Sequence, residues 1–280
     1  MCGGPTAWRD PGAEQPPIDL DHIGIATDEV ARGLRELAGG LGATVIYGGH
    51  APGCRYIVSR VGDAGAGMDL ELLEPHPDGE QFLPAFLARR GCGPHHLSFL
   101  VRDLDPLLER VRAAGIEPAV QRTEDPLWRE VFVRSADAAG IVVQLAQTTG
   151  GLRSDDAFAA ARAEEWRGAA ATQRQAWTNE TGSWWEWPGP RAAETAFLVR
   201  VAFAARDLDR VERFYGDLLG GEVVERTAAR LELRWPRGGT LRFAHAPDAR
   251  EGVAQLELDR LPAGRDELEG ARLVAAGEGA

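Results

Sequence analysis

The feature that most constrains the fold is a short pattern that occurs three times along the chain and begins a fourth time. Each occurrence places one apolar strand before an amphipathic helix, followed by three further strands bounded by Gly and Pro. The segment Arg-Asp-Leu-Asp at residues 102–105 recurs unchanged at residues 206–209, an offset of 104 residues. We therefore predict an α+β protein built from tandem βαβββ modules.

The pattern divides the chain into four parts. Residues 1–17 are rich in Pro and Gly and are predicted to form a flexible tail, and residues 18–148 hold the first two modules. Residues 149–194 break the pattern with a predicted helix and a Trp-rich loop, which either seals a seam between domains or covers a ligand. Residues 195–280 hold the third module and the start of a fourth, in which a helix is expected near Asp266.

The fourth module is expected to lack its last three strands, so that one complete pair of modules precedes an incomplete pair. An unpaired sheet edge and an uncovered concave face promote aggregation. We therefore expect the third module to complete its sheet against another chain or against the Trp-rich linker. A homodimer is the expected assembly.

Composition narrows the classes of function. The chain has 280 residues and a net charge of −12, which argues against nucleic acid as the main partner. All 31 basic residues are Arg, so Schiff-base and P-loop chemistry are excluded and a bacterial source is expected. No stretch has the roughly 20 apolar residues of a membrane helix, and no apolar signal-peptide core is present. Three widely spaced cysteines form no disulfide framework, so a cytoplasmic protein is predicted.

Four polar residues occupy matching positions in the first two modules. His22 and His96 lie on the first strands, 74 residues apart, and Glu71 and Gln144 lie on the last strands, 73 residues apart. Side-chain alternation places His22, His96 and Gln144 beside small residues, with bulky residues on the opposite face. Two imidazoles, one carboxylate and one amide oxygen suit a single divalent cation. These ligand types do not distinguish Co, Ni, Zn, Mn and Fe from one another.

Four segments resemble methylmalonyl-CoA epimerases, which belong to the vicinal oxygen chelate superfamily, also called the glyoxalase/bleomycin-resistance fold. The resemblance covers about residues 18–148, and residues 195–259 look like a second, more generic copy. It implies a concave sheet around one divalent metal, held by His22, Glu71, His96 (rather than His95) and Gln144. The segments are residues 21–26 (Asp-His-Ile-Gly-Ile-Ala), 70–75 (Leu-Glu-Leu-Leu-Glu-Pro), 93–99 (Gly-Pro-His-His-Leu-Ser-Phe) and 140–145 (Gly-Ile-Val-Val-Gln-Leu).

Two departures from the epimerase pattern bear on the chemistry. The last-strand ligands read Gln then Glu in the epimerases, but Glu71 then Gln144 here, which leaves the number of carboxylates unchanged. The epimerases also carry a proton-transfer carboxylate in a segment that corresponds to residues 49–55 here, where no acid is present. His50 is the titratable side chain nearest to that position and is predicted to be the catalytic base, with an exposed loop histidine as the alternative.

The second copy is expected to bind no metal. The offset of 104 residues places Arg200 at the position of His96, and Gln255 falls where another histidine ligand would lie. Arg200 and Arg242 either hold an anionic group of the substrate or form ordinary ion pairs.

These observations predict a metal-dependent isomerase or epimerase that moves a proton next to a metal-bound carbonyl or enolate. The expected partner is a small-molecule substrate, an acyl-CoA or an oxo acid, with neither nucleic acid nor a membrane involved. Two alternatives remain open. One is a non-haem iron dioxygenase, because two His and one carboxylate form that type of site. The other is a metal-free protein that binds small molecules or confers resistance, since fold alone does not decide function.

Overall fold

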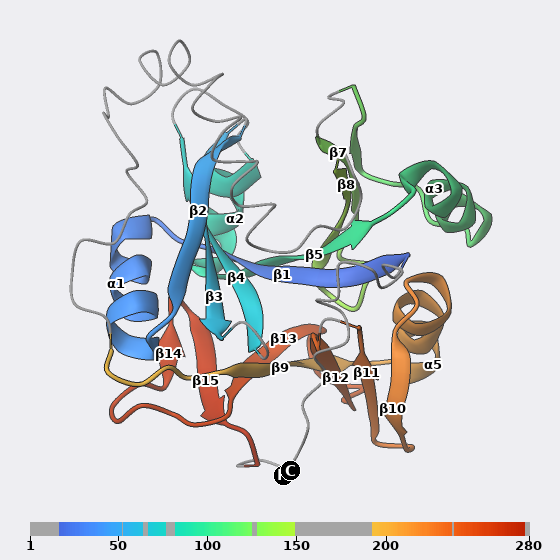
Figure 1. Ribbon diagram of the computed structural model, residues 1–280. Coiled ribbons are helices and arrows are strands. Elements are labelled where there is room, and N and C mark those ends of the chain that lie inside the picture. The colour runs from blue at the N-terminus through green and yellow to red at the C-terminus, as the bar shows by residue number, and fades with distance from the viewer. Residues whose placement is uncertain are drawn as a thin grey trace, which may run out of the picture.

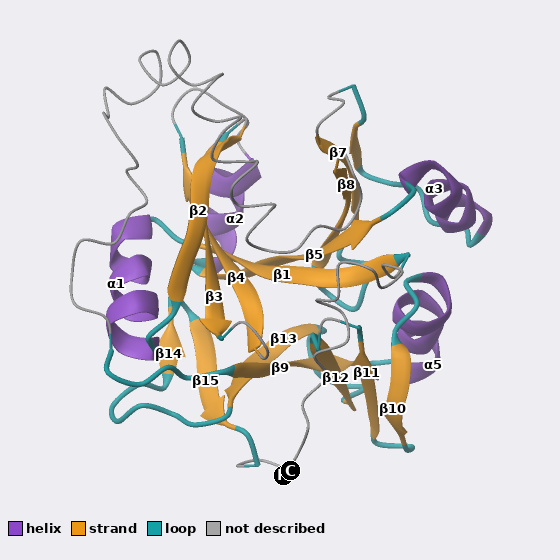
Figure 2. Ribbon diagram, viewed as in Figure 1, coloured by secondary structure: helices purple, strands orange, loops and turns teal. Residues whose placement is uncertain are grey.

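The computed structural model describes residues 17–51, 53–63, 67–76, 82–124, 128–148, 192–236 and 238–277. The predicted tail, apart from its last residue, and the predicted helix and Trp-rich loop of the linker lie outside these residues. Within the described part, the chain forms two mixed β-sheets of eight and seven strands, with helices at their flanks (Figures 1 and 2). None of the described helices is long and apolar enough to cross a membrane.

The first sheet contains two modules joined side by side. Its strand order is β2-β3-β4-β1-β5-β8-β7-β6, and the two modules meet where β1 and β5 pair in antiparallel register. In each module the first strand runs parallel to the last, β1 with β4 and β5 with β8. The elements are β1 (Ile18–Ala26), α1 (Val30–Leu41), β2 (Thr44–Ala51), β3 (Cys54–Gly62), β4 (Gly67–Pro75), α2 (Phe82–Arg90), β5 (Gly93–Val101), α3 (Leu104–Ala113), β6 (Val120–Arg122), β7 (Trp128–Val133) and β8 (Val142–Thr148).

Helix α2 is an addition between the modules that the sequence pattern does not predict. Leu83 is buried in it, and Phe86 and Leu87 pack beside Leu83 in a small cluster separate from the main core. Pro84 lies in its first turn, where the missing N–H costs no hydrogen bond. Helix α2 lies on the concave side of the first sheet (Figure 2).

The second sheet has the order β10-β11-β12-β9-β13-β15-β14. Its first four strands form the third module, and β13 pairs antiparallel with β9, as β5 pairs with β1. Helix α5 continues directly into a π-helical segment, Glu212–Leu218. The elements are β9 (Leu198–Ala205), α5 (Leu208–Val211), β10 (Glu222–Arg226), β11 (Arg230–Arg234), β12 (Thr240–His245), β13 (Gly252–Leu258), β14 (Glu267–Leu268) and β15 (Ala271–Ala275).

The fourth module differs from the sequence prediction. The helix expected near Asp266 is wrong, because Glu267–Leu268 forms β14. The second pair of modules is incomplete, as predicted, but it lacks fewer strands than expected, because β14 and β15 follow β13 in the described part of the chain. Strand β15 lies parallel to β13, as β8 does to β5. Glu269 and Gly270, with φ of 44° and 76°, close the tight turn between β14 and β15. The third module therefore completes its sheet within its own chain, which removes this reason to invoke a second copy.

The two sheets pack with their convex faces together and open in opposite directions (Figure 1). Apolar residues of β1 and β5 and those of β9 and β12 belong to one continuous core. At its centre the Phe99 ring lies 5.2 Å from that of Trp235 and 6.2 Å from that of Tyr215. The convex faces thus carry the core that joins the two sheets, and the concave faces lie on the opposite side.

Two tight turns, one from each sheet, pack against the start of a strand in the other sheet. The Glu269–Gly270 turn lies against the start of β5, where a Cβ on Gly270 would fall 2.1 Å from the Cys92 carbonyl oxygen. The turn that ends at Gly140, before β8, lies against the start of β13 in the same way, and a Cβ there would fall 2.3 Å from Glu251. Both glycines have positive φ, so the turn and the close approach each require glycine. The relative position of the two sheets is fixed by these reciprocal contacts.

Candidate metal centre

The concave face of the first sheet brings three of the four predicted ligands together. Strand β1 carries His22, β5 carries His96 and β4 carries Glu71. Gly24 lies directly opposite both Glu71 and His96 in the sheet. A Cβ on Gly24 would lie 2.3 Å from Cε1 of His96, so the absence of a side chain there makes room for the imidazole ring.

The three ligand atoms form a nearly equilateral triangle. Nε2 of His22 lies 3.3 Å from Nε2 of His96 and 3.4 Å from Oε2 of Glu71, and Nε2 of His96 lies 3.5 Å from the same carboxylate oxygen. Ligands about 2.1 Å from a tetrahedral cation are separated by about 3.4 Å. All three side chains are buried. The spacing therefore suits a single divalent cation without rearrangement.

The second nitrogen of each imidazole has a partner that orients the ring. Nδ1 of His22 lies 2.8 Å from Oδ2 of Asp21, and Nδ1 of His96 lies 3.2 Å from Nδ1 of His95. Outer contacts of this kind fix the tautomer and the direction of a metal-binding histidine. Both rings therefore present Nε2 to the triangle.

The charges of the site favour one proton on the histidine pair. Burial disfavours the imidazolium of His22, but the negative charges and hydrogen bonds of Glu71 and Asp21 outweigh this and raise its pKa to about 10. Burial and the neighbouring charge of His22 lower the pKa of His96 well below its usual value, and burial together with Arg90 lowers that of His95 to about 4. At neutral pH a cation entering the triangle therefore has to displace the proton of His22.

Gln144, the fourth predicted ligand, has one satisfied and one unsatisfied amide atom. It lies on β8 opposite Ser98, and Ser98 lies opposite His22, so the register repeats that of Glu71 and Gly24 in the first module. Its Nε2 donates a 2.6 Å hydrogen bond to Glu130, whereas its Oε1 is buried without a hydrogen-bond partner. A buried acceptor without a donor is costly in a protein interior, and a bound cation would satisfy it.

Glu130 is a buried acid of this site that the sequence analysis did not find. It lies on β7 and accepts hydrogen bonds from Gln144, from Nε1 of Trp128 at 2.7 Å and from Arg122 at 2.7 Å. The signal was available in the alternation of β7: Val131 and Val133 belong to the core, so Glu130 has to lie on the face that carries Gln144 on β8.

The triangle opens into a cavity of about 860 Å³. Its wall is mostly apolar and aromatic, and among its lining residues are Tyr56, Leu73, Phe82, Phe86, Trp128 and Phe132. Three exposed arginines, Arg89, Arg90 and Arg134, also line it, and none of them forms an ion pair with an acid in the described part of the chain. The cavity thus joins a buried ligand set to an apolar wall with cationic groups.

The predicted base, His50, lies on β2 directly opposite Arg55 of β3. The side chain of His50 lies outside the described part of the structure, so the role of His50 stays a prediction. On β3 the cavity-lining residues are Cys54 and Tyr56, and Arg55 between them pairs with Glu74.

The second sheet holds ion pairs where the first holds the triangle. Ala202 lies opposite both Arg242 and Gln255, the arrangement that Gly24 has with Glu71 and His96. Arg242 donates a 2.9 Å hydrogen bond to Glu232, and Arg200 pairs with Glu257. Of the two predicted roles for these arginines, the structure supports the ion pairs.

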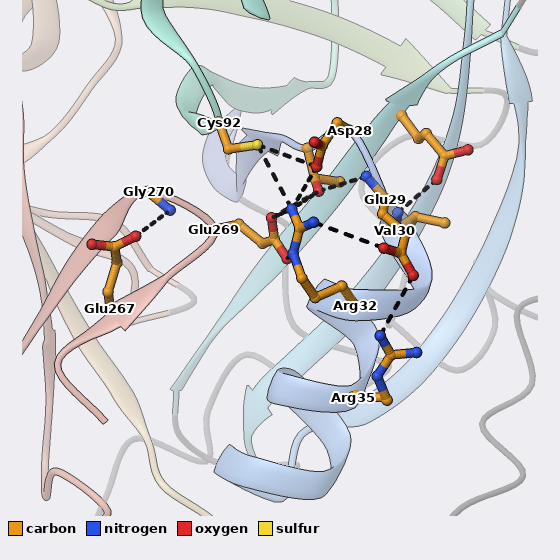
Figure 3. Close-up of polar contacts among 11 residues, drawn as sticks. Asp28, Glu29, Val30, Arg32, Arg35, Cys92, Glu267, Glu269 and Gly270 are labelled. Carbon is orange, nitrogen blue, oxygen red and sulfur yellow. Dashed lines mark hydrogen bonds and ion pairs between the residues drawn. The ribbon is translucent and has the colours of Figure 1, made fainter. Parts of the chain in front are cut away.

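A second group of potential ligands joins the two sheets. Asp28, Cys92 and Glu269 approach one another closely enough to hold an ion, but the guanidinium of Arg32 lies among them (Figure 3). Arg32 donates to both carboxylate oxygens of Glu269, at 2.8 and 2.5 Å, and to Asp28 at 2.5 Å. Thr27 donates to Glu269 at 2.8 Å. An arginine cation already neutralises these acids, so we regard this group as a link between the sheets.

We expect the two partners of this link to differ in their effect on stability. The Glu269 side chain is 1% exposed and that of Arg32 is 38% exposed. Arg32→Ala leaves a buried carboxylate with Thr27 as its remaining donor, and should lower the free energy of unfolding by about 3 kcal/mol. Glu269→Ala leaves the partly solvated Arg32 cation, which keeps Asp28 as its partner. This variant should lower the free energy of unfolding by about 1 kcal/mol.

Chemical denaturation of the two variants measures this difference. Arg35→Ala is the control, because Arg35 is exposed and pairs with exposed Glu29, so its loss should change stability by less than about 0.5 kcal/mol. A larger loss for Glu269→Ala than for Arg32→Ala would contradict the interpretation of Glu269 as the buried member of the pair.

Comparisons with known proteins agree with this fold. Residues 21–132 match the sequence model of the Glyoxalase/Bleomycin resistance protein/Dioxygenase superfamily, so this part of the first pair of modules is similar to the vicinal oxygen chelate proteins. No curated protein matches the chain.

Solved structures match the first half of the chain or nearly all of it. Methylmalonyl-CoA epimerase from Mycobacterium tuberculosis is 24% identical, with a TM-score of 0.41, over 49% of this chain and 92% of that one. A variant of the Streptomyces coelicolor epimerase in complex with 2-nitronate-propionyl-CoA is 24% identical, with a TM-score of 0.42, over 48% and 96%. A hypothetical protein from Staphylococcus aureus is 11% identical, with a TM-score of 0.54, over 91% and 98%. The last similarity shows that the fold of both sheets recurs in another protein.

Proposed function

We propose that this protein is a metal-dependent isomerase or epimerase, which moves a proton next to the carbonyl of an acyl or oxo-acid substrate. The observation that carries the proposal is the buried triangle of His22, Glu71 and His96 at the base of a large cavity. With Gln144 these residues would hold one divalent cation. When bound, the cation supplies Lewis-acid polarisation of a carbonyl or enolate oxygen.

The remaining parts of the cavity suit the rest of such a substrate. The aromatic and aliphatic wall receives an apolar carbon chain and excludes water from the reacting carbon. Arg89, Arg90 and Arg134 are placed to bind a carboxylate or phosphate at the other end of the molecule. An acyl-CoA and an oxo acid both combine these features. His50 remains the proposed proton acceptor, which requires its side chain to reach the cavity from the strand position opposite Arg55.

One observation favours a second candidate function. The close group contains two histidines and one carboxylate, which is also the ligand set of non-haem iron oxygenases. In that case Gln144 lies beside the metal without binding it, and open positions take up oxygen and substrate. The two functions differ in whether oxygen is consumed.

The test combines metal analysis with two assays on the full chain. After loading with a divalent metal, we expect solvent deuterium to enter a candidate acyl-CoA or 2-oxo acid next to its carbonyl, and chelation to abolish this exchange. Oxygen consumption with Fe(II), in the absence of any exchange, would instead support the oxygenase. A protein that retains no metal would overturn both and leave a binding protein.

A further inference from the structure

We propose that Glu130 is a positioning residue, which fixes the side-chain amide of Gln144 so that Oε1 remains available to a cation. The inference rests on the proposed metal centre and concerns how its fourth ligand is oriented. The two histidines have orienting contacts of their own through Asp21 and His95, and the carboxylate of Glu71 has lone pairs on both oxygens.

A glutamine ligand needs its orientation selected. The two ends of its amide are nearly equal in size, but only the oxygen has lone pairs for a cation, whereas the nitrogen carries two hydrogens. The Glu130 carboxylate accepts a hydrogen bond from Nε2 at 2.6 Å. In the opposite orientation Oε1 would meet the carboxylate, two acceptors without a proton between them. Glu130 therefore selects the orientation that leaves Oε1 unpaired, as the structure has it.

Glu130 is itself held in place. Trp128 donates to Oε2 and Arg122 to Oε1, each at 2.7 Å, so both carboxylate oxygens have a donor besides Gln144. The residue is 8% exposed, and these contacts offset the cost of its burial. The carboxylate is thus fixed by neighbours that belong to no ligand set. It orients Gln144 before a cation arrives.

The same contact explains the order of the ligand types along the chain. A carboxylate at position 144 would lie against that of Glu130, and the two negative charges would repel each other. In the first module the position equivalent to Glu130 is Tyr56: it lies opposite Leu73, two residues after Glu71, as Glu130 lies opposite Ala146, two residues after Gln144. An acid is therefore compatible with position 71, and position 144 takes an amide.

The test is a set of three variants of the full chain: Glu130→Gln, Gln144→Glu and the exchange of both residues. The readouts are the dissociation constant for Zn(II), the visible spectrum of the Co(II) protein and the thermal midpoint of the metal-free protein. Glu130→Gln should weaken Zn(II) binding about 10- to 100-fold, the usual effect of losing an outer contact of a ligand. Gln144→Glu should lower the thermal midpoint of the metal-free protein.

The exchange variant should restore what each single variant loses. An amide at position 130 can donate to a carboxylate at position 144, so the hydrogen bond is re-formed in reverse and an oxygen again faces the cation. Zn(II) affinity should return toward the wild-type value, whereas the thermal midpoint should recover only in part, because the N–H of Trp128 loses its acceptor at Oε2. Glu232→Gln is the matched control, because Glu232 has the same 8% exposure but lies in the second sheet. Its Zn(II) affinity should not change.

The outcomes separate this inference from the proposed function. Wild-type protein that takes up no cation would overturn the metal centre and the role of Glu130 with it. Wild-type protein that binds Zn(II), with Glu130→Gln equal in affinity and in Co(II) spectrum, would overturn the positioning role alone. A loss of Zn(II) affinity in Glu130→Gln that the exchange variant does not recover would also overturn the positioning role, since the contact would then be merely structural.

Discussion

Purified His22→Ala/His96→Ala protein should retain no divalent cation, whereas the wild type should retain one per chain. The double variant removes two of the three buried ligand atoms that lie 3.3 to 3.5 Å apart. Glu71 and Gln144 alone offer one carboxylate and one neutral oxygen, too few ligands to displace the water of a divalent cation. Metal analysis after loading and dialysis measures the difference.

Two further measurements make this result decisive. His245→Ala removes an exposed histidine of the second sheet and should keep the wild-type metal content. Circular dichroism should show that the double variant still unfolds cooperatively, because its substitutions lie on a cavity wall rather than in the apolar core. Full metal content in the folded double variant would mean that the cation binds at a site other than the triangle of His22, Glu71 and His96.

His50→Ala is expected to slow deuterium exchange about 10²- to 10⁴-fold, the usual contribution of a positioned base, while leaving the metal content unchanged. A histidine accepts a proton only in its neutral form. The wild-type rate should therefore fall as the pH is lowered from neutral to acidic values. Parallel exchange assays of the wild type and the variant across this range measure both effects.

His245→Ala again serves as the control and should exchange at the wild-type rate. Metal-dependent exchange that is indifferent to His50→Ala would remove this residue from the mechanism. Glu130, the carboxylate that lines the cavity beside Gln144, would then be the next base to examine.

The sequence predicts the modules and the ligand strands well because both depend on local alternation. Ile23 and Ile25 are fully buried in the core, and His22 and Gly24 alternate with them on the concave side, after a register shift between Leu20 and His22. The matched spacing of His22 with His96 and of Glu71 with Gln144 follows from the same sheet register in both modules. A local alternation pattern that recurs in both modules is therefore enough to predict the strands that carry these four residues.

Other features depend on contacts between segments that are distant in sequence. In the sequence, Glu130 looks like any polar residue that alternates with apolar residues along a strand. Its contact with the Gln144 amide is visible only once β7 lies beside β8. Strands β14 and β15 are short, and their pairing depends on the Glu269–Gly270 turn fitting against the start of β5. A helix near Asp266 was the reasonable expectation from local sequence, and the packing of the two sheets overrides it.

The reciprocal turns give the contact between the two halves the character of an isologous interface. Each half contributes the same feature to the other, a glycine turn seated on the first residues of a central strand, as two subunits do across a two-fold axis. In a symmetric dimer, the convex surfaces of two separate molecules would pair with each other. Here the convex surfaces of the two halves already pair within one polypeptide. A homodimer of this chain has to assemble through other surfaces, such as the outermost strands β2, β6, β10 and β14, and each copy would bring both halves to it.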